Sequence, residues 1–146
     1  RLHHYTGDAG YRDQAEQTLE TFAGVAEQFG IFAATYGIAV LHFLEPATQV
    51  VVVAAEEDED KADELHEAAV AAFSFGKVTI RLRTSQAVKE NLPPALGETI
   101  PNLPQLRSGK SFAVLCSGLT CKPPIFTASE LRSAIETAAP TSSTKH

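Results

Sequence analysis

A run of four valines, Val50 to Val53, constrains the fold of this chain more than any other feature. β-Branched side chains favour strands, and an apolar run without polar alternation indicates a strand that is buried on both faces. Such a strand is typical of a central, parallel position in a sheet that has layers on both sides. The sequence therefore predicts an α/β domain built around these residues.

The residues after the valine run predict a helix and then a second strand. The helix shows apolar residues at helical spacing and ends at Gly76; its inward residues are Ala62, Leu65, Ala69, Val70 and Phe73. Val78, Ile80 and Leu82 then alternate with polar residues, which indicates a half-exposed strand. The order strand, helix, strand predicts a βαβ unit with a right-handed crossover.

The remaining chain predicts an irregular stretch, a third strand and a last helix. Prolines and glycines interrupt residues 84–110, and the apolar run from Ser111 to Cys116 follows. Thr127 and Glu130 have the spacing of a capping box at the start of the last helix. We therefore expect a small, three-stranded, mostly parallel sheet flanked by helices.

An α-helical hairpin is predicted before this domain. Apolar residues recur every three or four positions from Tyr11 to Phe29 and again from Phe32 to Leu44, with Gly30 between them and Pro46 as the stop. Helices joined by so short a turn run antiparallel. We expect a hairpin over residues 1–48, an α/β domain over 49–139 and a disordered polar tail over 140–146.

The hairpin carries more apolar surface than a small sheet can cover. Its aromatic side chains are Phe22, Phe29, Phe32, Tyr36 and Phe43. A large exposed apolar patch usually marks a missing partner. We therefore expect this apolar hairpin face to pack against the rest of a longer chain or against a second copy.

Charge and hydropathy exclude several classes of partner. The formal net charge is −6, and the basic residues are scattered apart from a loose group of Arg81, Arg83 and Arg107. Nucleic acids and anionic membranes need a basic surface, so neither is expected as a partner. No run of about 18 apolar residues occurs, so no membrane span is predicted. A soluble, cytoplasmic protein is the expectation.

No catalytic, cofactor or metal site is predicted. The acidic run from Glu56 to Glu64 lacks the spaced ligands and turn glycine of a calcium loop, and suits a helix N-terminus instead. The turn after Val53 has no glycine and several carboxylates, which excludes dinucleotide phosphates there. No histidine has zinc-finger spacing from a cysteine. His42 and His66 are expected to face solvent or a polar pocket.

Cys116 and Cys121 form the one candidate functional pair. Cys116 ends a buried strand, and Cys121 lies five residues on, before a helix. Ligands gather at the carboxyl ends of strands in open α/β sheets, and a helix N-terminus lowers a thiol pKa. The alternatives are two small buried hydrophobic residues, or a thiol redox or disulfide role. We expect the thiols to be close together and reduced, with Cys121 the more accessible.

These elements, in this order, resemble the C-terminal end of the spermatogenesis-associated, thioredoxin-domain-containing protein family. The resemblance covers nearly the whole chain and rests on three pieces: the turn from Tyr5 to Asp8 with Tyr11 downstream, the Val50–Val53 strand after Pro46, and the segment from Phe112 through Cys121 to the Leu131 helix. It implies a parent with a thioredoxin-like domain, a six-hairpin glycosidase-like toroid and a small α/β end. The glycine that usually follows the family's strand is Ala54 here.

The resemblance implies that this chain is a C-terminal fragment. The absence of methionine and the start at Arg1 agree with that expectation. The predicted role is structural, closing and covering a larger carbohydrate-enzyme-like body, without catalysis of its own. Two alternatives stay open: a thiol redox module using Cys116 and Cys121, and an independent protein-interaction domain.

Overall fold

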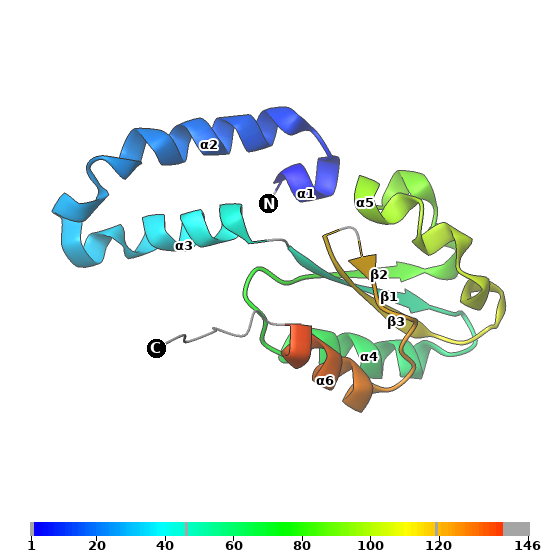
Figure 1. The fold of residues 1–146 in the computed structure, drawn as a ribbon. Coiled ribbons are helices and arrows are strands. Elements are labelled where there is room, and N and C mark those ends of the chain that lie inside the picture. Colours follow the sequence, from blue (N-terminus) through cyan, green and yellow to red (C-terminus); the bar gives the residue numbers. More distant parts are fainter. Residues whose placement is uncertain (1, 46, 119, 139–146) are drawn as a thin grey trace. The chain divides into compact units, whose positions relative to one another are not determined.

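The structure is a computed structural model that describes residues 2–45, 47–118 and 120–138. The chain divides into two compact units, Arg1–Pro46 and Ala47–His146 (Figure 1). We call them unit 1 and unit 2. The fold is α/β with helices at the N-terminus, as expected.

Unit 2 is built on a mixed sheet of four strands. They are β1 (Thr48–Ala54), β2 (Val78–Arg83), β3 (Phe112–Ser117) and β4 (Thr120–Cys121), in the order β2-β1-β3-β4. β1 is central and every one of its residues is buried, as the valine run predicted. β1 and β2 are parallel and joined through α4 (Glu59–Ala71), which makes the βαβ unit.

The expectation of three mostly parallel strands is wrong. β3 runs antiparallel to β1, and β4 adds a fourth, antiparallel strand. The reason lies in where the chain re-enters the sheet. β2 ends with Arg83 opposite Ala54, and β3 begins with Phe112 opposite Val53, at the same edge. No described helix between them is long enough to carry the chain back to the other edge, so β3 enters in the opposite direction.

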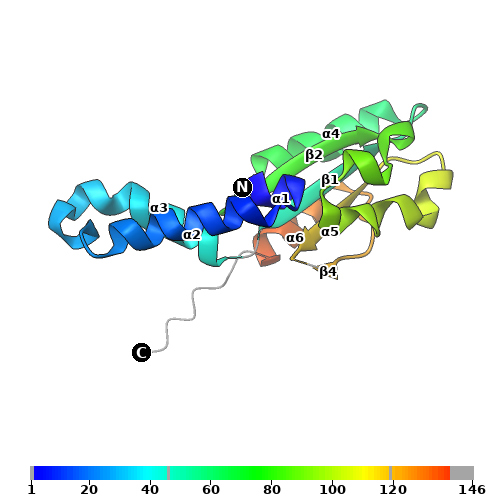
Figure 2. The same ribbon diagram turned by 90° about the horizontal axis from the view of Figure 1, so that it is seen from above.

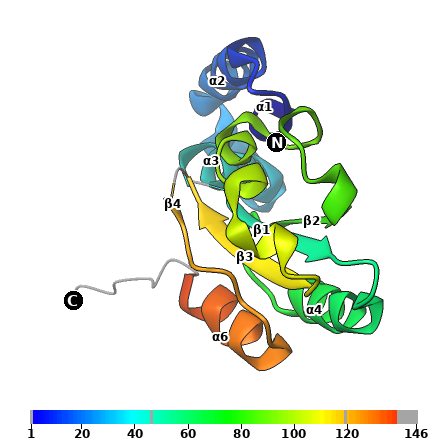
Figure 3. The same ribbon diagram turned by 90° about the vertical axis from the view of Figure 1, so that its right-hand side faces the viewer.

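The two faces of β1 belong to two separate apolar clusters. Val50, Val52 and Ala54 pack against α4 and α6 (Ala128–Ala138) on one side. Val51 and Val53 pack on the other side against Leu96, Ile100 and Phe112, among others. Figure 3 shows α4 and α6 on one side of the sheet and α5 on the other. Alternation along a strand therefore divides four identical residues between two cores.

The second layer comes from the segment that the sequence described as irregular. It folds into short turns: η2 (Thr84–Gln86), η3 (Lys89–Asn91), α5 (Pro94–Gly97), η4 (Ile100–Asn102) and η5 (Pro104–Arg107). Prolines stand in the first turn of the last three, where a missing N–H costs nothing. Their apolar residues cover the sheet face that α4 and α6 leave open.

Unit 1 is a helical hairpin without a buried core. It contains α1 (Leu2–Thr6), α2 (Ala9–Ala23), the 3₁₀ segment η1 (Ala26–Ala33) and α3 (Ala34–Leu44). α2 and α3 overlap in the view of Figure 2, and the Tyr36 hydroxyl of α3 donates a hydrogen bond to the Leu19 carbonyl of α2 at 2.9 Å. None of the residues of α2, η1 and α3 is buried.

One stretch of unit 1, Ala26–Leu44, is long and apolar enough by length and composition to cross a membrane. The expectation that no segment spans a membrane stays a prediction, since this finding concerns length and composition alone. Gly30 interrupts the helical path, with φ 52° and ψ −125°. The regular helix α3 has 11 residues, and about 16 Å of helix is shorter than a hydrocarbon core of about 30 Å.

Candidate functional site

Cys116 and Cys121 are joined in a disulfide. The sulfurs are 2.02 Å apart and the Cα atoms 4.0 Å apart. The expectation that the cysteines are close together agrees with this geometry, and the expectation that they are reduced is wrong in this structure. The cause is strand pairing: β3 and β4 place the two residues directly opposite each other.

A tight hairpin turn brings the cysteines into register. Ser117 pairs with Thr120, so the turn begins directly after Ser117, at Gly118. Gly118 has φ +59°, the left-handed conformation that two-residue hairpin turns require at their first position. Beyond the disulfide, the Lys122 N–H donates to the Leu115 carbonyl at 2.8 Å. Cys121 therefore lies in a strand, where the sequence analysis had expected a loop.

The disulfide also lies at a different sheet edge from the one expected. Cys116 pairs with Gln49, near the start of β1. Because β3 is antiparallel, its carboxyl end meets the amino ends of β1 and β2. The rule that ligands gather at carboxyl ends of strands concerns parallel strands, so it gives no support to a ligand site at these cysteines.

The two sulfur-bearing residues differ in exposure as expected. Cys116 is completely buried within the apolar cluster that holds Val51 and Val114. Cys121 is half-buried and packs at the margin of the same cluster. Reagents from solvent therefore reach Cys121 first. Lys122, next to it, is exposed.

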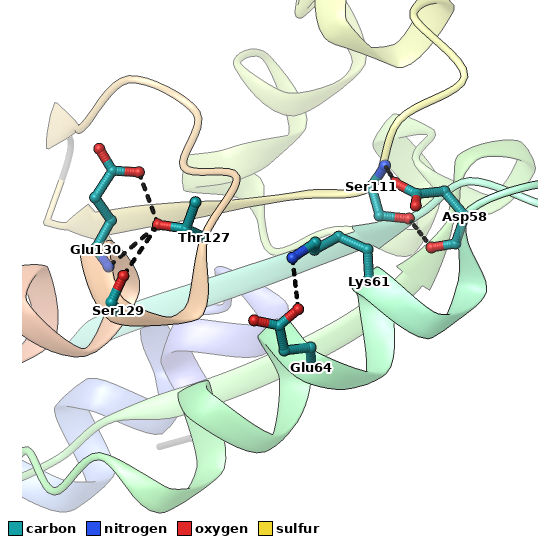
Figure 4. A network of polar contacts seen from close by, with 7 residues as sticks. All are labelled: Asp58, Lys61, Glu64, Ser111, Thr127, Ser129 and Glu130. Carbon is teal, nitrogen blue, oxygen red and sulfur yellow. Dashed lines mark hydrogen bonds and ion pairs between the residues drawn. The ribbon is translucent and has the colours of Figure 1, made fainter.

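At the carboxyl edge of β1, Asp58 and Ser111 hold the chain together (Figure 4). The Ser111 N–H donates to the Asp58 carboxylate and the Ser111 hydroxyl donates to the Asp58 carbonyl, both at 2.7 Å. The Ala55 N–H donates to the Ser111 hydroxyl at 3.0 Å. The polar groups at this edge thus satisfy one another, and the Asp58 carboxylate would repel a phosphate.

The acidic run has structural partners. Arg81 of β2 pairs with Glu59 at 2.7 Å and with Asp63 at 2.6 Å. Lys61 pairs with Glu64 one turn further along α4 (Figure 4). Glu59 and Asp60 lie in the first turn of α4, where carboxylates favour the helix dipole. Across the described residues, no group of three or more histidine, cysteine and acidic side chains is arranged to hold a metal ion.

Thr127 caps α6 in a modified form of the capping box. The Glu130 N–H donates to the Thr127 hydroxyl at 3.3 Å, and that hydroxyl donates to the Glu130 carboxylate at 3.1 Å (Figure 4). The sequence analysis expected the carboxylate to accept from the backbone of Thr127. Both versions stabilise the first turn of α6.

Of the described histidines, His3 and His42 line the same hollow of unit 1, and His66 lies on α4 of unit 2. The His3 ring lies 3.0 Å (Nδ1) from the Asp8 carbonyl oxygen. His42 lies on α3 and lines a hollow of unit 1. His66 is half-buried on α4, and its Nδ1 is buried without a hydrogen-bond partner among the described residues.

Two hollows in unit 1 were not found by sequence reasoning. The larger, about 590 Å³, lies among α1, α2 and α3. At its wall the Arg12 guanidinium lies 4.6 Å from the centre of the Phe43 ring. The smaller, about 200 Å³, lies between α2 and α3 and includes Glu16 and Glu20. The acidic and apolar residues of α2 that line it have the spacing of any amphipathic helix, so the sequence contains no distinct signal for it.

Comparison with known proteins finds no matching family model, no similar curated protein and no similar solved structure. The family resemblance therefore stays a prediction that rests on the residues quoted for it.

Proposed function

We propose that this chain is a C-terminal structural segment of a larger protein, without catalysis of its own. In this proposal unit 1 completes a helical body and unit 2 is a covering domain. A parent with a thioredoxin-like domain and a carbohydrate-enzyme-like toroid is the family expectation. The observation that carries the structural role is the hairpin: among the described residues of unit 1, none is buried.

The composition of α3 supports this role. No charged residue occurs between Glu27 and Glu45. A helix that is apolar on all sides is a buried helix in a complete protein, and α2 covers α3 on one side alone. Large apolar side chains are exposed along the hairpin: Leu2, Tyr11, Phe22, Val25, Phe29, Ile31, Phe32, Ile38, Leu41 and Leu44. In this proposal, a surface of the rest of the parent protein covers these side chains.

Unit 2, in contrast to unit 1, has a buried apolar core. Its buried apolar residues form two clusters on the two faces of the sheet. Val70 and Phe73 are 61% and 84% exposed, so the prediction that they face inward is wrong. Glycoside hydrolysis needs two carboxyl groups about 5–10 Å apart across a bond. Among the described carboxylates of unit 2, Glu59 and Asp63 pair with Arg81, Glu64 pairs with Lys61, Glu98 pairs with Lys89, and Asp58 accepts from Ser111. This supports a covering domain.

The structural proposal is tested by hydrophobic-dye fluorescence and sedimentation on the whole chain. Strong dye binding or self-association is expected. Ile31→Ser with Phe32→Ser should reduce it, because these side chains are 84% and 86% exposed in unit 1. Val70→Ser with Phe73→Ser is the matched control, on exposed positions of unit 2, and should change it less. A monomer without dye binding, or turnover of a glycoside by the chain, would contradict the proposal.

The alternative function is a thiol redox module, and the disulfide is the observation that favours it. A dithiol reductant would attack the Cys121 sulfur, and Cys116 would leave as a thiolate. The second thiol of the reductant would then release Cys121, so the dithiol is oxidised and the protein gains two electrons. The burial of Cys116 opposes this step, because an apolar environment disfavours the leaving thiolate.

The rate of reduction separates the two functions. A redox module should be reduced by a dithiol as fast in the native protein as in the denatured protein. A structural disulfide should react far more slowly when the chain is folded. The same disulfide weighs against the cytoplasmic location expected from the sequence, since standing disulfides are rare in the cytosol.

A further inference from the structure

The smaller hollow of unit 1 is a groove between two helical stripes. Glu16, Leu19, Glu20 and Ala23 line it from α2, at positions i, i+3, i+4 and i+7. Tyr36, Val40 and Phe43 line it from α3, at positions i, i+4 and i+7. Such spacings place each set on one side of its helix. We call this surface the α2–α3 groove.

The floor of the α2–α3 groove is apolar and fixed. Leu19, Tyr36, Val40 and Phe43 are half-buried. The hydrogen bond from the Tyr36 hydroxyl to the Leu19 carbonyl ties the two helices together along the floor. A third helix packs into such a groove between two antiparallel helices at about 8–10 Å from each axis.

The two rims of the groove differ in charge. Glu16 and Glu20 are exposed on the α2 rim, one helical turn apart. Neither carboxylate has an ion-pair partner within the part of the chain that the structure describes. The α3 rim has no charged residue at all. The groove is therefore acidic along one side and uncharged along the other.

We propose that the α2–α3 groove binds an amphipathic helix of another polypeptide segment that carries Lys or Arg along one edge. The apolar stripe of that helix covers Leu19, Val40 and Phe43, and its basic edge faces Glu16 and Glu20. Its other edge, over α3, is uncharged. The inference rests on the proposed structural role and names the chemistry of the partner that the hairpin requires.

Two other occupants fit the groove less well. Three of the long described helices have one Lys or Arg each, Arg12 in α2, Lys61 in α4 and Arg132 in α6, and α3 has none. A second copy therefore offers no described helix with two cations one turn apart. An anionic membrane surface is repelled by the α2 rim.

The test measures peptide binding to the whole chain by fluorescence anisotropy. The probe is a helical peptide of about 18 residues with a Leu and Ala stripe and Lys along one edge. Its twin has Glu at the Lys positions. The Lys peptide should bind about tenfold more tightly than the Glu twin at low salt, because two exposed pairs change from attraction to repulsion. Added salt should reduce this preference.

Glu16→Lys with Glu20→Lys should reverse the preference between the two peptides. Both positions are exposed and helical, and Lys is a good helix former, so the hairpin is retained. Glu67→Lys with Glu136→Lys is the matched control, with the same change in net charge at exposed helical positions of unit 2, and should leave the preference unchanged. Circular dichroism checks the helix content of each variant.

Each contrary result has a distinct meaning. Equal binding of both peptides, or a preference that Glu16→Lys with Glu20→Lys does not alter, overturns the charge-directed groove. Self-association that the Lys peptide does not displace assigns the groove to a second copy and also overturns it. Absence of binding by either peptide, with dye binding retained, overturns this inference and leaves the structural role standing. If the unaltered chain binds no dye, the structural role itself is overturned.

Discussion

Two hydrogen bonds join Ser111 to Asp58, although these residues lie 53 positions apart in the chain. The Ser111 hydroxyl also accepts from the Ala55 N–H. A single buried side chain therefore fixes the loop after β1 to the start of β3. This explains how β3 is aligned at the edge where it enters the sheet.

Ser111→Ala should destabilise unit 2 by about 1–3 kcal/mol, since it leaves the Ala55 N–H and the Asp58 carbonyl without the hydroxyl. Urea denaturation followed by circular dichroism measures the change. Ser129→Ala, at an exposed position of α6, is the matched control and should change the stability by less than about 0.5 kcal/mol. Equal effects of the two substitutions would show that the Ser111 contacts contribute nothing special.

The cysteines should be absent from a thiol titration of the denatured, unreduced protein. Two thiols should appear after reduction, because the structure joins Cys116 and Cys121. Closing so short a loop restricts the unfolded chain, so reduction should cost about 2 kcal/mol of stability. Thermal denaturation with and without reductant measures that difference. Two titratable thiols before reduction would rule out the standing disulfide.

Leu65→Ala should cost about 2–5 kcal/mol, because Leu65 is completely buried between α4 and the sheet and a cavity would remain. Phe73→Ala removes a larger side chain that is 84% exposed, and should cost less than about 0.5 kcal/mol. Chemical denaturation of both variants makes the comparison. A smaller loss for Leu65→Ala than for Phe73→Ala would contradict the burial described for α4.

Lys77 caps the C-terminal end of α4 from outside the helix. Its ammonium donates to the carbonyls of Ala69, Val70 and Ala72. Lys77→Met should cost about 0.5–1 kcal/mol near neutral pH, because those carbonyls lose a cationic donor. Lys110→Met, at an exposed loop position, is the control.

The pH dependence of stability gives a second test of the role of Lys77. Partial burial lowers the pKa of its ammonium from the ordinary 10.5, so the unfolded chain binds the proton more tightly than the folded chain. Stability therefore rises as the pH increases through the lowered pKa towards 10.5. Relative to Lys77→Met, the unaltered chain should gain stability over that alkaline range. A difference that stays constant with pH would contradict the lowered pKa.

The valine run was sufficient to predict β1, since a strand that is apolar at every position has to be covered on both faces. The same reasoning could not give the direction of β3. The run from Phe112 to Leu115 reads the same for either direction, and the direction depends on the edge at which the chain re-enters the sheet. The periodicity of a short segment contains no information on that long-range relationship.

The two residues of the candidate site were predicted from the sequence, but their disulfide and their place in a strand pair were not. Spacing alone drew attention to Cys116 and Cys121, but their bond depends on the register of a two-residue strand, β4, that is too short to show a pattern. The α2–α3 groove was missed because Glu16 and Glu20 look like ordinary solvated positions on an amphipathic helix. Their meaning depends on the uncharged helix α3 beside them.

Because β1 lies at the centre of unit 2, hydrogen exchange can follow the stability of the two units separately in one intact chain. β1 is hydrogen-bonded to β2 on one side and to β3 on the other, and all of it is buried. Its amide protons should therefore exchange with deuterated water through global opening of unit 2 alone. The amides of α2 and α3, which lack a buried core around them, should exchange through local opening. When a partner binds the hairpin, slower exchange should appear in α2 and α3 while the rates in β1 stay constant.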